Sequence, residues 1–234
     1  MARPTMAQDI ERKIKELILD RALGPGDPVP AESELMELFS AGRVPVREAL
    51  KALQAVNVVE TGRGFGTFVG SLSLTPFAEA LALRAAVRHG RGEPGLLELM
   101  RVREALETGL VGAVSVGVPA EDVAVPQTLV ARMEAEAAGE GRVARPTDRA
   151  FHLALYTSLD NHLLSEVLDA FWAAMDRTRE SVETGSQDFA VTCAQHREIV
   201  SAVAAGDCAR AVRAMRAHFN GIRARLEISS ATPV

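Results

Sequence analysis

The sequence contains very little cysteine and few aromatic residues. Cys193 and Cys208 are the only two cysteines among 234 residues, and aromatic residues make up 4% of the chain. Two isolated cysteines cannot form a disulfide framework, which favours a reducing, cytoplasmic setting. No apolar run reaches the roughly 20 residues that a membrane-spanning helix needs, and the first residues lack the apolar core of a signal peptide. We therefore expect a cytoplasmic protein without membrane contacts.

An excess of positive charge is also missing. The 26 Lys and Arg residues are outnumbered by 31 Asp and Glu residues, which gives a net charge of −5. Divided after residue 70, the chain carries 9 basic and 10 acidic residues in its first part, and 17 and 21 in its second. Neither part is basic. Binding to nucleic acid would therefore depend on a local cationic patch, and its non-specific component should be modest and salt-sensitive.

Residues 29–50 predict two helices joined by a short turn. The first apolar stripe comprises Leu35, Met36, Leu38 and Phe39, and the second comprises Val46, Ala49, Leu50, Leu53 and Val56. The opposite face of the second helix carries Arg43, Arg47, Lys51 and Gln54. A helix that is packed on one side and cationic on the other suits the major groove of DNA, although an ordinary solvated helix face has the same pattern.

The flanking segments complete a winged-helix pattern. An amphipathic helix around residues 10–18 precedes the pair, and the Gly- and Pro-rich residues 24–28 predict a tight loop. After the pair, residues 57–70 predict a β-hairpin with Arg63 and Gly64 in its turn. Glycines at a hairpin tip allow close approach to a groove or to phosphates. The order of these elements favours DNA binding over a purely structural hairpin.

Specific runs of residues in this part resemble the N-terminal domain of GntR-family transcriptional regulators. They are Ala22–Asp27, Val29–Glu32, Arg43–Leu50 and Gly66–Val69. The resemblance implies that Arg43, Arg47 and the wing tip at Arg63 and Gly64 contact the operator. Lys51, on the same helix face, is predicted to be a more peripheral DNA contact. Ser33, Gly42 and Val44 depart from the family pattern, which implies an operator or an affinity that differs from those of relatives.

The remainder of the chain predicts only helices. Apolar periodicity is present in residues 76–89, 96–116, 127–138, 147–159, 162–183, 188–205 and 208–227. The predicted fold class is therefore mainly α, with an N-terminal winged helix-turn-helix and a C-terminal all-α bundle. We expect four parts: a DNA-binding domain (1–70), a linker (71–75), a helical effector-binding and dimerisation domain (76–228) and a tail (229–234).

All five histidines lie after residue 75. Asp148 and His152 are four residues apart and so share a helix face. His196 and His218 lie at nearly equal distances, about 15–16 Å, on either side of the predicted break at Gly206 and Asp207. If the two helices form a hairpin, three imidazoles and a carboxylate could converge as a site for zinc, nickel or manganese. On spacing alone, ordinary packed or surface histidines are as good an explanation.

A second resemblance bears on this choice. Four segments resemble the helical ligand-binding domain of the FadR subgroup of the GntR family: Asp148–His152 with Asn161, His196–Ile199, Met215–His218 and Leu99–Glu107. It implies a divalent metal, most simply zinc, on Asp148, His152, His196 and His218, and a homodimer that senses a small organic or sugar acid. It leaves His89 and His162 as surface or packing residues. Arg103 would bind the effector carboxylate, with a surface salt bridge to Glu107 as the alternative.

We therefore predict a metabolite-responsive DNA-binding regulator, a repressor that reads a pseudo-palindromic operator as a homodimer and is not an enzyme. One alternative retains DNA binding but replaces the metal and small acid with a metal-free pocket for a larger acyl-type ligand. A metal-dependent hydrolase is a further alternative, but the sequence offers no evident general base or nucleophile for it.

Overall fold

The computed structural model describes residues 3–62, 66–117, 119–179 and 188–231. These residues form ten α-helices, one short 3-10 helix and three short strands, which confirms the predicted mainly α fold class. Contacts divide the chain into two compact units, Met1–Pro76 and Phe77–Val234. None of the described helices is both long enough and apolar enough to cross a membrane.

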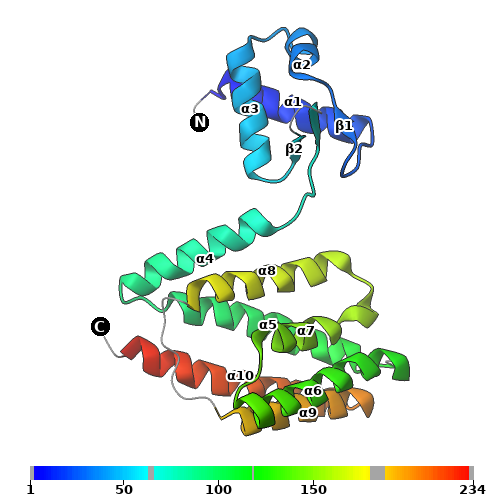
Figure 1. The fold of residues 1–234 in the computed structure, drawn as a ribbon, viewed down its shortest axis with the longest axis vertical. Helices are drawn as coiled ribbons and strands as arrows, with labels where there is room; N and C mark the ends of the chain where they lie inside the picture. Colours follow the sequence, from blue (N-terminus) through cyan, green and yellow to red (C-terminus); the bar gives the residue numbers. More distant parts are fainter. Residues whose placement is uncertain (1–2, 63–65, 118, 180–187, 232–234) are drawn as a thin grey trace. The chain divides into compact units, whose positions relative to one another are not determined.

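The first unit has the element order of a winged helix. Its elements are α1 (Met6–Asp20), β1 (Pro28–Val29), α2 (Glu32–Leu38), α3 (Arg43–Ala55), β2 (Val59–Gly62) and β3 (Gly66–Val69). Helix α1 begins at a capping box, in which the Thr5 side chain accepts a hydrogen bond from the Gln8 amide and the Gln8 side chain accepts one from the Thr5 amide. Helix α3 packs on α1 (Figure 1), and the buried side chains of Ile10, Ile14, Leu35, Val46 and Leu53 join the helices to the sheet.

The sheet is antiparallel in the order β1-β3-β2. The predicted hairpin is formed by β2 and β3, with Val59 opposite Val69. The prediction that residues 24–28 form only a loop is wrong at its last residue, because Pro28 pairs with Phe68. Pro28 is the first residue of an edge strand, where the missing proline N–H costs no ladder hydrogen bond.

The second unit is a bundle of helices. Its elements are α4 (Thr75–Gly90), α5 (Gly95–Val114), α6 (Ala120–Glu140), α7 (Arg145–Ala154), the 3-10 helix η1 (Thr157–Leu159), α8 (His162–Arg179), α9 (Phe189–Ala204) and α10 (Cys208–Ala231). Six of these helices close into a ring of neighbours: α5 packs on α10, α10 on α9, α9 on α6, α6 on α7, α7 on α8 and α8 on α5. Figure 1 shows α5 between α8 and α10.

Two helix boundaries lie at least five residues from the predicted ones. Helix α6 begins at Ala120 rather than near residue 127, and it continues through Pro126. One backbone hydrogen bond is lost there, but Val123 and Val130 are buried in the core on either side of the proline. Helix α7 ends at Ala154 rather than at residue 159, and η1 follows after a short turn. Periodicity alone does not separate a 3-10 turn from the end of an α-helix.

Candidate metal and effector site

The helix ring brings three histidines together. His152 comes from α7, His196 from α9 and His218 from α10. All three side chains are buried, and one ring nitrogen of each lies within 4.8 Å of those of the other two. The ring centroids of His196 and His218 are 4.6 Å apart, as expected for a hairpin of α9 and α10 with the two residues at matching heights. The structure therefore brings together the histidines that the sequence singled out.

Asp148 lies beside this cluster. Its Oδ1 is 2.9 Å from Nε2 of His196 and 3.6 Å from Nε2 of His152. Burial would raise the pKa of Asp148, but the hydrogen bond and the charge of His196, together with His152 and His218, hold this pKa far below its usual range. Asp148 is therefore a carboxylate with an oxygen directed at two imidazoles.

The hydrogen bonds of His196 direct its second ring nitrogen at the carboxylate of Asp148. Its Nδ1 lies 2.8 Å from the carbonyl oxygen of Thr192, so Nδ1–H donates to that oxygen. In the neutral ring, Nε2 then carries a lone pair that faces the carboxylate of Asp148. Two acceptors at this distance repel each other unless a proton or a metal ion lies at the contact.

Among the described residues of the cluster, His218 has the strongest need for a ligand. Both of its ring nitrogens are buried, and neither has a hydrogen-bond partner among the described residues. Burial lowers the pKa of His218 well below its ordinary value, and the nearby His196 and His152 lower it further, so the ring is neutral. Leaving a buried polar group without a partner costs about 1–3 kcal/mol. A metal ion that accepts the lone pair of one nitrogen would offset this cost for that nitrogen.

A buried carboxylate lies behind the histidines. Glu107 on α5 is completely buried and contacts Nδ1 of His152 through Oε2. Its Oε1 accepts a 2.5 Å hydrogen bond from Nε of Arg103, and the hydroxyl of Tyr156 donates to Oε2 over 3.1 Å. Burial acts to raise the pKa of Glu107, but Arg103 and His152 outweigh it and the pKa falls to about 2.

Arg103 is part of the same group. Arg103 does form the predicted salt bridge with Glu107. The prediction that this pair lies on the surface is wrong, because the two side chains are only 2% and 0% exposed. The guanidinium carbon of Arg103 lies 3.7 Å from the ring centroid of Trp172. Its Nη2 is buried and has no hydrogen-bond partner among the described residues. This nitrogen is available to a ligand.

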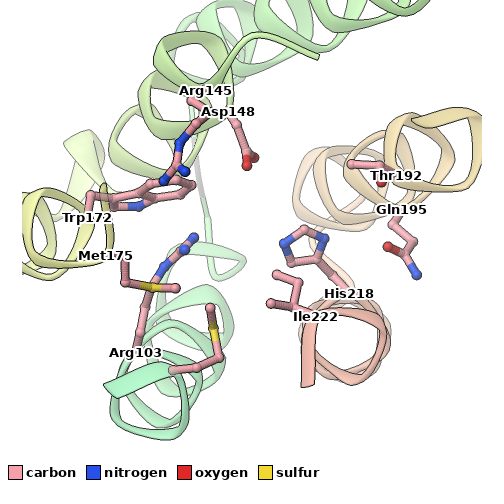
Figure 2. Close-up of a pocket in the computed structure, with 10 residues that line it drawn as sticks. Arg103, Arg145, Asp148, Trp172, Met175, Thr192, Gln195, His218 and Ile222 are labelled. Carbon is pink, nitrogen blue, oxygen red and sulfur yellow. The ribbon is translucent and has the colours of Figure 1, made fainter. Parts of the chain in front are cut away.

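A cavity of about 50 Å³ adjoins these groups. Its lining includes Arg103, Asp148, Trp172, Gln195 and His218. Figure 2 shows Arg103 extending from α5 toward the space between Trp172 and His218, with Asp148 on the far side. The buried Nε1 of Trp172 also lacks a partner among the described residues. The cavity thus combines metal-ligand groups with unsatisfied hydrogen-bond donors.

Sequence reasoning did not assign Glu107, Tyr156 or Trp172 to the site. Glu107 was visible only as the residue four positions after Arg103. Trp172 is the single tryptophan of the chain, and its position in an apolar helix gave no sign of a role. Neither His89, half-buried on α4, nor His162, exposed at the start of α8, belongs to the cluster.

The predicted DNA-facing residues lie on α3. The side chains of Arg43 and Arg47 are 67% and 60% exposed, and Lys51 is exposed on the same helix. Glu32 of α2 lies between the two arginines, 3.2 Å from Nε of Arg43 and 2.8 Å from Nε of Arg47. Gly42 is the N-cap of α3 and provides no side-chain cap. The predicted wing residues, Arg63 and Gly64, lie outside the described residues.

Comparisons with known proteins agree with the two-unit organisation. Residues 6–69 match the family of bacterial regulatory proteins, gntR family, and residues 98–221 match the FCD domain. The second match covers more than half of the chain. The chain belongs to the GntR family. This confirms the resemblance seen in the sequence, and the FCD domain is consistent with the FadR subgroup.

Full-length relatives support the same assignment. The HTH-type transcriptional regulator LutR of Bacillus subtilis is 30% identical over 88% of this chain and 94% of its own length. The HTH-type transcriptional repressor NanR of Salmonella arizonae is 25% identical over 96% of this chain and 85% of its own. In fold, the chain is similar to the solved structure of Streptococcus agalactiae GntR, with a TM-score of 0.68, 23% identity and coverage of 93% and 99% of the two chains. This GntR-family protein is thus a transcriptional regulator rather than an enzyme.

Proposed function

We propose that this GntR-family protein is a repressor whose helical unit binds a divalent metal and a small carboxylate effector. The observation that carries the proposal is the cluster of three buried histidines beside the half-buried Asp148, in which both nitrogens of His218 lack partners among the described residues. No arrangement of protons satisfies His218 without a ligand. The effector binding to this site would change the affinity of the protein for DNA.

The donor set fits a borderline divalent cation. Three imidazole nitrogens and one carboxylate oxygen suit zinc best, with nickel and manganese as alternatives. His152, His196, His218 and Asp148 would hold the ion, and an open coordination position would face the cavity. When bound, the metal supplies a positive centre to which an effector oxygen can coordinate.

The size and chemistry of the cavity favour a small acid. Arg103 offers its unpaired Nη2 to a carboxylate, and Trp172 lies against the same guanidinium. A cavity of about 50 Å³ accommodates only a few non-hydrogen atoms, because one water-sized probe already takes roughly 10–15 Å³. An acyl-type ligand would need a larger cavity, such as the one of about 330 Å³ lined by Leu81, Ala85 and Phe171 in the same unit.

The DNA-binding role is proposed for the first unit. Arg43, Arg47 and Lys51 share the exposed face of α3, and Arg63 and Gly64 are predicted to join them at the wing. We propose residues 1–70 as the DNA-binding domain, 71–75 as the linker, 76–228 as the effector and dimerisation domain and 229–234 as the tail. A homodimer of this kind would read a pseudo-palindromic operator in the cytoplasm.

The proposal is tested by metal analysis and gel shifts on the full-length protein. Protein purified without chelators should contain about one metal ion per chain, and His196→Ala should lose it. Binding to operator DNA, obtained by selection from random sequences, should change when small mono- and dicarboxylates are added. If neither metal removal nor any acid altered DNA binding, the sensory role would be wrong. Sub-stoichiometric metal in the wild type, unchanged in His196→Ala, would favour the acyl-type alternative.

A further inference from the structure

Glu107 is the one carboxylate among the described residues that contacts both a predicted metal ligand and the predicted effector residue. One oxygen contacts Nδ1 of His152 and the other accepts from Nε of Arg103. The Tyr156 hydroxyl donates to the oxygen that His152 contacts. Arg103 can only donate hydrogen bonds, and its buried ion pair keeps Glu107 ionised, so His152 and Tyr156 also meet this carboxylate as donors. The Glu107 side chain has no solvent exposure that would let it reorient.

We propose that Glu107 is the positioning residue of this site, which prepares His152 for the metal and Arg103 for the effector. The proposal rests on the metal and effector roles proposed above. An ionised carboxylate can only accept hydrogen bonds, so Nδ1 of His152 must carry the hydrogen. Nε2 is then left with the lone pair, and this nitrogen is buried without a hydrogen-bond partner among the described residues, on the side of Asp148.

The same carboxylate determines which end of Arg103 is available. It holds Nε, while the guanidinium lies against the Trp172 ring and Nη2 is left unpaired. A guanidinium fixed at one edge presents the rest of its donors in a fixed plane, which suits recognition of a carboxylate. Glu107 therefore orients two residues of different function from a point behind both of them.

The competing explanation is that Glu107 only neutralises a buried arginine. That role predicts a loss of stability on substitution but no specific effect on the metal. Affinity for zinc in the full-length protein separates the two, measured by competition with a chromophoric chelator. Glu107→Gln keeps the shape but loses the charge, and zinc affinity should fall by about 10- to 100-fold, as for other groups that orient a metal-bound histidine.

Glu104→Gln is the matched control. Glu104 is also on α5 and also pairs with an arginine, Arg223, but among the described residues it forms no ion pair or hydrogen bond with the three histidines. The zinc affinity of the Glu104→Gln variant should stay within about twofold of the wild type, because Glu104 does not orient a metal ligand. Circular dichroism and thermal melting of the metal-free variants establish that each is folded before zinc is added.

A double-mutant cycle tests whether Glu107 acts through His152. In a His152→Ala background, adding Glu107→Gln should lower zinc affinity by less than about threefold, because the ring it positions is absent. A full 10- to 100-fold loss in that background as well would mean that Glu107 does not act through His152 and would overturn the proposal.

The Arg103 half of the proposal has its own readout. Trp172 is the sole tryptophan and lies against Arg103, so its fluorescence should respond to an anion that binds there. With acetate as the probe, at saturating zinc, Glu107→Gln should weaken binding by about tenfold, because the guanidinium is no longer held. Equal zinc and acetate affinities in Glu107→Gln and the wild type would overturn this inference alone. Absence of zinc binding in the wild type would overturn the proposed function itself.

Discussion

At the scale of single residues, His218 combines a cost to the fold with a role in the proposed metal site. Its ring is buried with two unpartnered nitrogens, and its depressed pKa keeps it neutral. A leucine of similar size would remove both polar atoms and keep the packing. The residue is therefore expected to lower the stability of the metal-free protein.

We predict that His218→Leu raises the free energy of unfolding of the metal-free protein by about 1 kcal/mol, because a buried polar group without partners is removed. The same substitution should abolish stabilisation by zinc. Urea unfolding in the presence of a chelator, and then with zinc, measures both effects. His162→Leu, at an exposed position on α8, is the control and should change neither quantity. A loss of stability in metal-free His218→Leu would contradict the prediction.

The titration of the buried histidines predicts a pH dependence for the metal-free protein. Burial lowers the pKa values of His152 and His218 from their ordinary value of 6.5, so the unfolded chain takes up protons that the folded chain does not. Stability should therefore fall as the pH drops below about 6.5, by up to about 1.4 kcal/mol per pH unit for each ring. The pKa of Glu107 is about 2 in the folded protein, compared with its ordinary value of 4.5. The folded protein should therefore lose further stability as the pH falls from 4.5 toward 2.

Urea unfolding at pH 7.5, 6.5 and 5.5 with a chelator present measures this dependence. His218→Leu should show a shallower slope, since one of the two rings is missing. A stability that is flat or rises toward pH 5.5 would show that the histidines are protonated in the fold.

At the scale of elements, α3 combines a buried face with an exposed cationic one. Val46, Ala49 and Leu53 anchor it in the core, while Arg43 and Arg47 lie on the outside with Glu32 between them. These ion pairs are well exposed, and pairs of that kind contribute little to stability. DNA can therefore displace them at small cost.

We predict that Arg43→Ala and Arg47→Ala each weaken binding to the selected operator by about 1–3 kcal/mol and relax its sequence preference, as expected for arginines that read base edges. Lys51→Ala should weaken binding to all DNA sequences and reduce the salt dependence by about one counterion, as expected for a phosphate contact. Gel shifts at several salt concentrations measure these changes.

Arg12→Ala is the control for this series. Arg12 on α1 is an exposed arginine that pairs with Asp9 and Glu16 of its own helix. An equal loss in this variant would indicate a diffuse electrostatic attraction rather than recognition by α3.

At the scale of the whole molecule, we expect the two compact units to differ in how much zinc stabilises them. The histidine cluster belongs entirely to Phe77–Val234, so zinc should stabilise that unit and leave Met1–Pro76 unaffected. Zinc at 100 times its dissociation constant contributes about 2.7 kcal/mol, which corresponds to an increase in Tm of roughly 5–10 °C for a unit of this size.

Calorimetry of the full-length protein with zinc or with chelator tests this expectation. Only the transition of the helical unit should move, and His196→Ala should remove the shift. A shift of both transitions, or of neither, would contradict the assignment of the metal to this cluster.

Much of the fold could be predicted because its signals are local. The apolar stripes of α1, α2 and α3, the hairpin glycines and the four-residue spacing of Asp148 and His152 are each contained in a short segment. The periodicity of the backbone places residues at such spacings on the same face of a helix or strand. Even the matching heights of His196 and His218 follow from counting residues away from one break in a helical hairpin.

The sequence by itself therefore determined the helices, the order of the two units and the set of candidate donor residues. Only the tertiary structure decided what surrounds those donors. Glu107, Tyr156 and Trp172 join the site because the ring of six helices brings α5, α7 and α8 together behind the histidines. Burial and pairing depend on which helices become neighbours, and that depends on packing across the whole bundle. For this reason Arg103 and Glu107, whose spacing equally predicts a surface salt bridge, form a buried ion pair at the centre of the proposed site.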